Sequence, residues 1–466
     1  MRRNALVIGS GPNGLSAAIV LAKAGWQVEV HEASSRIGGG ASSAQLTLPG
    51  FLHDVGSAVH PFAVASPFFR SLPLGIEWIH PPVPLAHPLD DGTAVLLHRE
   101  LRQTADALGI DWQSWRNLFG PLVRDWDIYR HEFLAPLGWT NHPVAMARLG
   151  INAVLPASFL IRRHFRAERA RALFTGLAAH YPFLNQPLSA GFGLVLGAAA
   201  QATGWPIPRG GAQSITNALA IHLQALGGII RTEMPVTRLT DRYGLVMADT
   251  SPGALAQIAG DRLPSSFRRQ LERFRRGPGS FKVDWALSAP IPWRAKEASQ
   301  AGTVHLGGTS EEILASEDAA VNGRHSERPY ILLSQPTLFD PSRAPEGKHI
   351  AWAYCHVPNG SDRDMTNQIE AQIERFAPGF RELVLARHVA APAALERENA
   401  NLVGGDVTGG MSDFRQTLFR PTWRRYATPN PAIWLCSSST PPGAGVHGMC
   451  GYHAARRAIA SQNTRS

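Results

Sequence analysis

Glycines at positions 9, 11 and 14 precede an acid at position 32 near the start of this chain of 466 residues. In this spacing Gly9 permits a tight turn, Gly11 lets the backbone approach a pyrophosphate, and Gly14 lets a helix pack closely on a strand. Glu32 follows about 20 residues later, where a carboxylate accepts hydrogen bonds from the hydroxyls of an adenosine ribose. The pattern predicts a dinucleotide site, and the negative charge of Glu32 disfavours the 2′-phosphate of NADP.

The segments around these residues supply the strands and the helix that such a site needs. Residues 5–8 are a short apolar run suited to a buried parallel strand. Residues 15–24 have helical character and end at Gly25, a typical helix stop. The N-terminus of this helix would direct its N–H groups and positive dipole end at the pyrophosphate. Residues 27–31 then form a second strand that delivers Glu32 at its carboxyl end.

A second glycine run follows the acid directly, at Gly38, Gly39 and Gly40, with Arg36 before it. An Arg-x-Gly-Gly segment at this place resembles that of the large FAD superfamily containing amine oxidases and phytoene desaturases. The resemblance implies that the arginine and the backbone amides line the path of the FAD diphosphate and ribityl chain. Gly40 replaces the second arginine that is usual in that superfamily, so this side-chain contact to the flavin is absent. The cofactor predicted here is therefore FAD rather than NAD.

Length and composition set further bounds. A chain of this length with 44% hydrophobic and 17% charged residues is typical of a globular protein with two domains. It has only three cysteines, no C-x-x-C pair and no histidines at ligand spacing, so we predict neither thiol–disulfide chemistry nor a metal site. There is no uncharged apolar run of about 18 residues, and the first strand begins by residue 5, so we expect a cytoplasmic protein.

The net charge is +9, and nearly all of the basic residues are arginines. The basic residues are scattered and match no recognised binding motif, so we predict no nucleic-acid partner. Two interpretations of the charge remain open. Either it solvates the surface, or it attracts the chain to anionic lipid head groups in a peripheral membrane contact.

The order of patterns along the chain predicts an α/β fold with a discontinuous Rossmann-like FAD-binding domain. Helical spacing dominates residues 101–202, α/β patterning returns at 205–260 and again near the end, and strand-like runs fill 278–360. We therefore expect the second, substrate domain to be α+β, with a mixed antiparallel sheet and a helical insertion. The expected FAD-binding domain comprises residues 1–75, 205–260 and 425–466, and the expected substrate domain comprises residues 76–204 and 261–424.

Four motifs together make the chain resemble the phytoene desaturase-like FAD oxidoreductases, in the branch of the pyridine nucleotide-disulfide oxidoreductase domain 2 proteins. The motifs are GSGPNGLSAAI at 9–19, PRGGAQSITNAL at 208–219, RRGPGSFKVDWAL at 275–287 and CSSSTPPGAGVHGMCGYHAA at 436–455. The likeness covers nearly the whole chain. The disulfide part of the branch name is unsupported, because the cysteine pair that it requires is missing.

The resemblance implies which residues hold the cofactor. Val236 would lie on the strand that meets the adenine, and the turn at 442–449 would pass the flavin ring and begin the last helix. That helix N-terminus would stabilise negative charge at the flavin's pyrimidine carbonyl. Ser437 and Ser438 replace the usual Gly-Asp or Gly-Glu, which weakens one expected contact. The implied cofactor residues are Gly9, Gly11, Pro12, Asn13, Gly14, Glu32, Ala33, Arg36, Gly38, Gly39, Gly40, Val236, Ser437, Gly445, Val446, His447 and Met449.

Three residues are candidates for chemistry beside the flavin, and each has a structural alternative. His60 can transfer protons as a neutral imidazole, or it can be a packing residue. His447 can be a base, a cofactor contact or a helix cap. Lys282 lies mid-strand in a chain poor in lysine, and a similar lysine in amine oxidases holds a water against flavin N5; alternatively it pairs with Asp284 on the same strand face.

The predicted reaction is removal of a hydride from a largely apolar small molecule, as in C–C desaturation of a polyene. Because no second nicotinamide motif is present, we expect electrons to pass to a quinone or to oxygen. Flavin amine oxidation and a non-catalytic, regulatory flavoprotein are the alternatives. Residues 60–92 and 101–202 are rich in aromatic side chains, which would either line an apolar substrate tunnel or form ordinary core.

Overall fold

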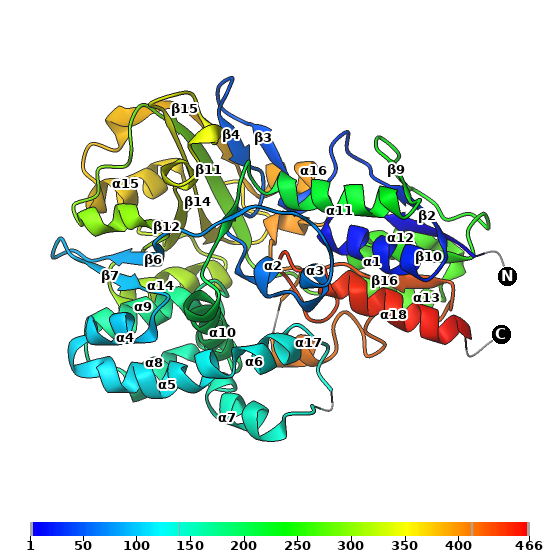
Figure 1. Ribbon diagram of the computed structural model, residues 1–466, viewed down its shortest axis with the longest axis horizontal. Helices are drawn as coiled ribbons and strands as arrows, with labels where there is room; N and C mark the ends of the chain where they lie inside the picture. Colours follow the sequence, from blue (N-terminus) through cyan, green and yellow to red (C-terminus); the bar gives the residue numbers. More distant parts are fainter. Residues whose placement is uncertain (1–2, 139, 412, 464–466) are drawn as a thin grey trace.

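The computed structural model describes residues 3–138, 140–411 and 413–463, and its elements surround two large β-sheets (Figure 1). The first sheet has five strands in the order β16-β10-β1-β2-β9, and all neighbours are parallel. These strands come from distant parts of the chain, so the predicted discontinuous Rossmann-like fold is confirmed. Their bounds are β1 (Asn4–Ile8), β2 (Gln27–His31), β9 (Ile229–Arg231), β10 (Leu245–Ala248) and β16 (Ile433–Leu435).

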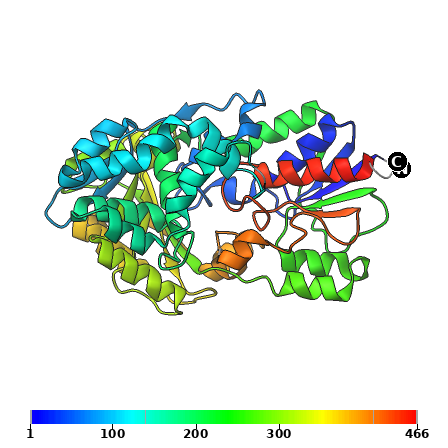
Figure 2. The same cartoon turned by 90° about the horizontal axis from the view of Figure 1, so that it is seen from below.

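Helices cover both faces of this sheet (Figure 2). Alternate residues of β1 explain the two layers, because Ala5 and Val7 pack toward one helical layer whereas Leu6 and Ile8 pack toward the other. The first layer contains α1 (Pro12–Lys23), α11 (Gln213–Ala225) and α18 (Met449–Asn463), and the second contains α12 (Pro252–Ala259) and α13 (Ser265–Glu272). Since α13 packs on the five-stranded sheet, the predicted boundary at residue 260 divides one helical layer.

The second sheet has seven strands in the order β15-β11-β14-β13-β12-β6-β7. All neighbours are antiparallel except β12 and β6, so the sheet is mixed, as predicted. Its strands are β6 (Val83–Pro88), β7 (Ala94–Leu97), β11 (Gly279–Leu287), β12 (Ala301–Leu306), β13 (Ile331–Ser334), β14 (His349–Val357) and β15 (Val384–Ala390).

The two faces of the seven-stranded sheet differ in chemistry. One face is apolar: Phe281, Val283 and Trp285 of β11 pack with Ile369 and Ile373 of α15 (Thr366–Phe376). The other face carries a set of polar and aromatic side chains that are almost all buried, which we call the polar face. Its residues are His87, Ser280, Lys282, Asp284, Thr303, His305, Ser334, Trp352, Tyr354 and His356.

A layer of helices forms the predicted helical insertion and packs into one large core. Trp115 stacks on Phe119 with ring centroids 4.3 Å apart, and Phe165 and Phe174 join the same cluster. These aromatic side chains therefore serve as core. The helices of the insertion are α4 (Leu101–Asp106), α5 (Trp112–Arg124), α6 (Trp126–Phe133), α7 (Pro143–Ala153), α8 (Ala157–His164), α9 (Glu168–Ala178) and α10 (Ser189–Ala202). A later helix, α14 (Ser310–Val321), lies outside the predicted range and packs against α9.

Short elements connect these layers. They are β3 (Ser43–Gln45), β4 (Leu52–Asp54), β5 (Trp78–Ile79), β8 (Ile207–Pro208), α2 (Pro61–Ala65), α3 (Pro67–Arg70), α16 (Pro392–Glu398) and α17 (Phe414–Leu418). Within the described ranges, no single helix is long and apolar enough to cross a membrane; α7 and α8 meet that test only as a pair, with a bend of 91° between them.

Candidate functional site

The glycine loop lies between β1 and α1, as the sequence predicts. Gly9 has a φ of 95°, a conformation that favours glycine, and Gly11 is the N-cap of α1. A Cβ atom at Gly14 would collide with the carbonyl oxygen of Gly9, so the close packing of helix on strand requires glycine there. Pro12 occupies the first helical position, where its missing N–H costs nothing.

Glu32 organises the end of β2 beside this loop. One carboxylate oxygen accepts hydrogen bonds from the backbone N–H of Ser10 at 2.8 Å and from its hydroxyl at 2.7 Å. The other oxygen accepts the N–H of Ser34 at 2.9 Å. Because an ionised carboxylate offers about four lone-pair sites, acceptor capacity remains for ribose hydroxyls.

Asp249, which the sequence analysis missed, lies directly under the glycine loop. It follows β10, its side chain is buried, and its Oδ2 accepts the N–H of Gly14 at 2.8 Å. The same oxygen would lie 3.0 Å from a Cβ atom at Gly11. Burial raises the pKa of Asp249 to about 7; the Gly14 hydrogen bond opposes this shift and the charge of Glu32 adds to it. The position of Asp249 directly after a predicted strand is the feature of the sequence that could have identified it.

The loop fits the ADP part of a dinucleotide. The N-terminus of α1 follows a turn whose glycines pack closely against Asp249, and its N–H groups can bind a diphosphate. Three buried polar atoms close to the ends of β1, β10 and β16 have no hydrogen-bond partner among the described residues: Asn13 Oδ1, Thr250 Oγ1 and Ser437 Oγ. Buried polar atoms without partners are rare in folded proteins and indicate a bound group or ordered water.

The other implied cofactor residues occupy different settings. Arg36 forms an ion pair with Glu398 across the loop from α16. Gly38 has a φ of 117° in the turn that follows, and a Cβ atom at Gly40 would meet open space. Val236 is not on a strand, contrary to the expectation, because β9 ends at Arg231 and an irregular segment follows. Its side chain packs at the edge of the core around α12 and α13.

His447 lies in the turn before α18, together with Gly445 and Val446. Its Nδ1 accepts the backbone N–H of Met449 at 3.0 Å, so of its predicted roles the structure displays the helix cap. Its carbonyl accepts the hydroxyl of Ser66 at 2.7 Å. Burial lowers the pKa of the ring to about 4, which keeps the imidazole neutral.

His60 is buried at the start of α2, and neither of its ring nitrogens has a hydrogen-bond partner among the described residues. Burial lowers its pKa to about 4; the charge of Asp54 opposes the shift and that of Arg343 adds to it. The ring is therefore a neutral imidazole with free donor and acceptor capacity, which is the state that a proton-transfer group needs.

Lys282 projects from the polar face of the seven-stranded sheet. Its Nζ lies 2.6 Å from both oxygens of Asp284, which realises the predicted alternative of a pair on one strand face, and 3.0 Å from the carbonyl oxygen of Asp54. Burial acts to raise the pKa of Asp284, but the charge of Lys282 and hydrogen bonds from His388 and Lys282 outweigh it, so the net shift is downward.

Asp54 of β4 links the two sheets and two of the three candidate residues. Its carboxylate accepts the N–H of Ala212 at 2.7 Å, at the start of α11, and forms a buried ion pair with Arg343 at 2.8 Å. Its carbonyl accepts from Lys282, and its charge acts on His60. Neither the ion pair nor the link was predicted, because the sequence separates its members by more than 150 residues.

A cluster of histidines and a carboxylate at the other end of the polar face was also missed. His356 Nδ1 lies 2.6 Å from Glu317 of α14, and His180 Nε2 lies 3.1 Å from His305 Nε2. The described residues contain no set of three or more ligands able to hold a metal ion. The available signal was the alternation in β14, where Trp352, Tyr354 and His356 alternate with small or apolar residues.

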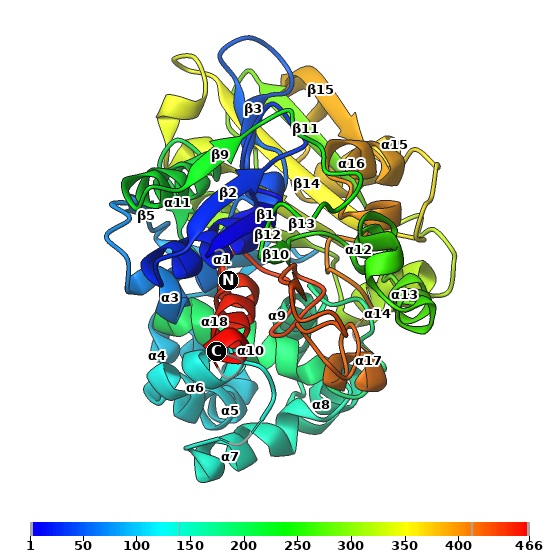
Figure 3. The same ribbon diagram turned by 90° about the vertical axis from the view of Figure 1, so that its right-hand side faces the viewer.

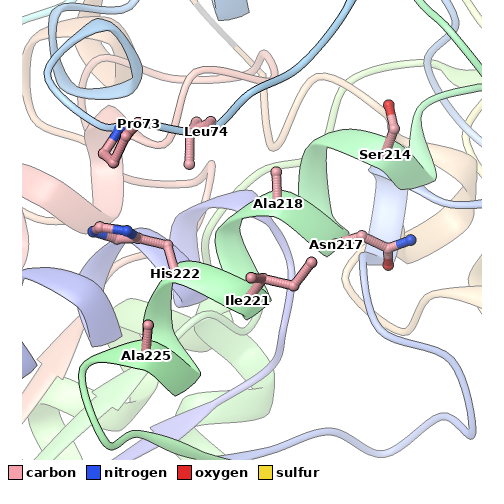
Figure 4. Close-up of a pocket in the computed structure, with 8 residues that line it drawn as sticks. All are labelled: Pro73, Leu74, Ser214, Asn217, Ala218, Ile221, His222 and Ala225. Carbon is pink, nitrogen blue, oxygen red and sulfur yellow. The ribbon is translucent and has the colours of Figure 1, made fainter.

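A separate groove of about 340 Å³ lies on the outer side of α11, against residues 73–74 (Figure 4). Ile221 and His222 line it, and none of the predicted site residues does. A second groove of about 500 Å³ lies beside β2 and β9 and is lined by Glu29, Arg231 and Arg242 among others. The predicted site residues thus line neither of these two surface grooves.

Comparisons with known proteins agree with this geometry. The NAD(P)-binding Rossmann-like domain family matches residues 7–72. The chain is 26% identical to the pyridine nucleotide-disulfide oxidoreductase domain-containing protein 2 of Mus musculus, over 97% of this chain and 92% of that protein. It is 23% identical to the phytoene desaturase (neurosporene-forming) of Rhodobacter capsulatus, over 52% of this chain and 51% of that protein.

A solved structure of wild-type putrescine oxidase bound to putrescine has the same fold, with a TM-score of 0.62 at 17% identity over the whole of both chains. The chain is thus homologous to the domain 2 proteins and to phytoene desaturases, and it is structurally similar to amine oxidases. The predicted resemblance is confirmed. All three cysteines are free and buried, at 355, 436 and 450.

Proposed function

We propose that this protein is an FAD-dependent oxidoreductase that removes a hydride from a small molecule at the polar face of the seven-stranded sheet. The observation that carries this proposal is the link through Asp54, which joins the start of α11 in the nucleotide-binding half to Lys282 on the polar face. A dinucleotide held at the glycine loop would extend along this side of the molecule toward that face.

In this proposal the chain's own residues divide the work. Glu32 binds the ribose, and the N-terminus of α1 binds the diphosphate. Bound FAD would supply the hydride acceptor. Lys282 holds a proton beside the reacting centre, and the neutral ring of His60 can accept or donate one. Burial of both side chains excludes bulk water from that region.

The finer assignment is C–C desaturation of a largely apolar, polyene-like substrate, with quinone or oxygen as the electron acceptor. Homology to phytoene desaturases supports it. Amine oxidation is the second candidate, because the fold is that of putrescine oxidase and a lysine lies on the polar face. A non-catalytic flavoprotein is the third alternative.

Anaerobic reduction of the bound flavin tests the proposal. Purified protein is expected to be yellow and to release free FAD when it is precipitated with acid. Bleaching of the flavin absorption by a polyene supports desaturation, and bleaching by an amine supports amine oxidation. A protein that binds FAD tightly but is bleached by no member of a polyene, amine and amino-acid panel would favour the non-catalytic alternative.

We also propose that the protein contacts membranes peripherally through α7 and α8. Val144, Ile151 and Phe159 on these helices and Val154 between them are between 45% and 73% exposed. Figure 3 shows α7 at the lower end of the molecule, opposite the end that carries β3 and β15. Such a surface would bring an apolar substrate source close to the helical layer.

A further inference from the structure

The polar face contains more unsatisfied hydrogen-bonding capacity than a structural sheet needs. The described part of the chain gives no hydrogen-bond partner to Ser280 Oγ, His305 Nδ1, His356 Nε2 or Glu317 Oε1, although all four side chains are buried. Natural proteins satisfy nearly all buried polar atoms. Four unsatisfied atoms around one end of a sheet face therefore point to a ligand that supplies their partners.

Two aromatic side chains at this face, Tyr354 and His180, are only partly buried. Tyr354 lies on β14 between Lys282 of β11 and Leu332 of β13, both buried, yet Tyr354 itself keeps part of its surface accessible. His180, at the end of α9, is also partly accessible and faces His305. Packing at this point of the sheet is therefore incomplete around these two side chains.

The Glu317–His356 pair defines what such a ligand must offer. His356 Nδ1 lies 2.6 Å from Glu317 Oε2, and when Nδ1 of a neutral imidazole donates to a carboxylate, Nε2 is left as an acceptor. His356 Nε2 and Glu317 Oε1 both lack a hydrogen-bond partner among the described residues. Ser280, directly across the strand pair from His356, adds a hydroxyl. The pair therefore offers acceptors and needs a donor.

The charges around the pair exclude other ligands. Among the described residues Glu317 lies within ion-pair distance of His356 alone, and no lysine or arginine pairs with it. Lys282, two residues from Ser280 on the same face, is already neutralised by Asp284. A carboxylate or phosphate ligand would meet uncompensated negative charge, and a plain hydrocarbon would leave every acceptor unsatisfied.

We propose that Glu317, His356 and Ser280 form a subsite that binds a hydrogen-bond donor group of the substrate, either a hydroxyl or an ammonium. This inference rests on the proposed oxidoreductase function and specifies its substrate class. Ser280 and Lys282 are two residues apart on one strand face, a separation of roughly 6.6 Å. A donor group in the subsite thus lies within a small molecule's length of the proposed reacting centre.

Four probes of similar size and different head groups test the subsite. They are benzyl alcohol, benzylamine, toluene and benzoate, each titrated into the FAD-loaded protein while the flavin absorption spectrum is followed. We expect benzyl alcohol or benzylamine to bind at least about 10-fold more tightly than toluene and benzoate, because one hydrogen bond to a charged group contributes about that factor to the affinity. The better of the two identifies the donor as hydroxyl or ammonium.

Two variants and one control assign the preference to these residues. Glu317→Gln and Ser280→Ala each should reduce the discrimination between donor probes and toluene, Glu317→Gln by about 10-fold or more. Glu370→Gln is the control, because Glu370 is equally buried and hydrogen-bonded but lies on the apolar side of the sheet, against Trp285. It should leave the discrimination unchanged.

Three results would overturn the inference: equal binding of toluene or benzoate, an unchanged preference in Glu317→Gln, or no spectral response to any probe. The flavin spectrum reports the proposed function separately, since a protein without bound FAD fails that proposal. In that event the same probes are compared by their effect on the thermal unfolding midpoint. A shift by the donor probes alone would retain the subsite, and no shift would remove it.

Discussion

At the scale of single residues, the raised pKa of Asp249 predicts that the affinity for FAD depends on pH. Its carboxyl group has a pKa raised to about 7 under the glycine loop, where Glu32 is already negative. The other titratable groups around it, Cys436 and Cys450, are buried thiols whose pKa values are also raised. A diphosphate brought to the loop adds negative charge and would raise the pKa of Asp249 further.

FAD binding should therefore take up a proton at Asp249, and the affinity should fall as pH rises above 7. Each pH unit between the two pKa values is worth up to about 10-fold in the dissociation constant. Calorimetric titration of the apoprotein with FAD, in buffers of different ionisation enthalpy, measures the proton uptake. Asp249→Asn retains the acceptor for Gly14 and should abolish both the uptake and the pH dependence. An identical pH dependence in this variant would contradict the assignment.

Glu32 provides a second test at the same scale. Glu32→Ala removes the acceptor for the ribose and also frees the N–H groups of Ser10 and Ser34. Weaker FAD binding by about 1–3 kcal/mol is expected. Glu29→Ala is the matched control, because Glu29 lies on β2, the strand that ends directly before Glu32, but pairs with Arg242 instead of the glycine loop. Equal affinities of the two variants in FAD titrations would speak against the ribose contact.

At the scale of elements, the strands β11 and β14 show what could be predicted and what could not. The alternation in β11 assigns Lys282 and Asp284 to one face and Trp285 to the other, and the structure agrees. A polar face normally meets solvent, however, and this one is covered by helices from residues 101–202 together with α14 and β4. That layer packs through contacts distant in sequence, so the cluster around Glu317 and His356 could not be foreseen from local patterns.

The glycine loop was easier to predict for the opposite reason. Its strand, turn, helix and acid all lie within the first 32 residues, and the chemistry of the turn requires glycine at fixed positions. Val236 failed as a strand residue because its assignment came from a resemblance and not from a local pattern. Asp249 reaches the loop only through the pairing of β10 with β1.

The pairing of Lys282 with Asp284 on β11 sharpens the test of its role. Lys282→Met should leave FAD bound while flavin reduction or reoxidation in stopped flow slows by about 10-fold or more, the contribution of one positioned proton-transfer group. In this variant the carboxylate of Asp284 still has two imidazole rings close to it, those of His53 and His388. Lys296→Met, at an exposed lysine, is the control. Unchanged rates in both half-reactions would leave Lys282 as the structural partner of Asp284.

At the scale of the whole molecule, the exposed apolar side chains of α7 and α8 determine the expected behaviour toward membranes. Arg162 and Arg163 at the end of α8 are exposed beside this surface, so anionic head groups should strengthen the contact. The pair is sharply bent, with 91° between its helices, which suits insertion into one leaflet's interface. The groove beside α11 and the glycine loop lie on other elements and would stay free.

Liposome flotation measures this contact. The protein should float with vesicles containing anionic lipid, and less with neutral vesicles, because basic residues near a surface contribute about 1 kcal/mol each. The double variant Val144→Asp with Ile151→Asp places charge where the apolar face would enter the lipid and should abolish flotation. Ile221→Asp is the matched control, since Ile221 is 66% exposed on α11, away from these helices. If wild-type protein stays at the bottom with both kinds of vesicle, or if Ile221→Asp has the same effect as the double variant, this surface does not bind membranes, and any apolar substrate must reach the polar face from solution.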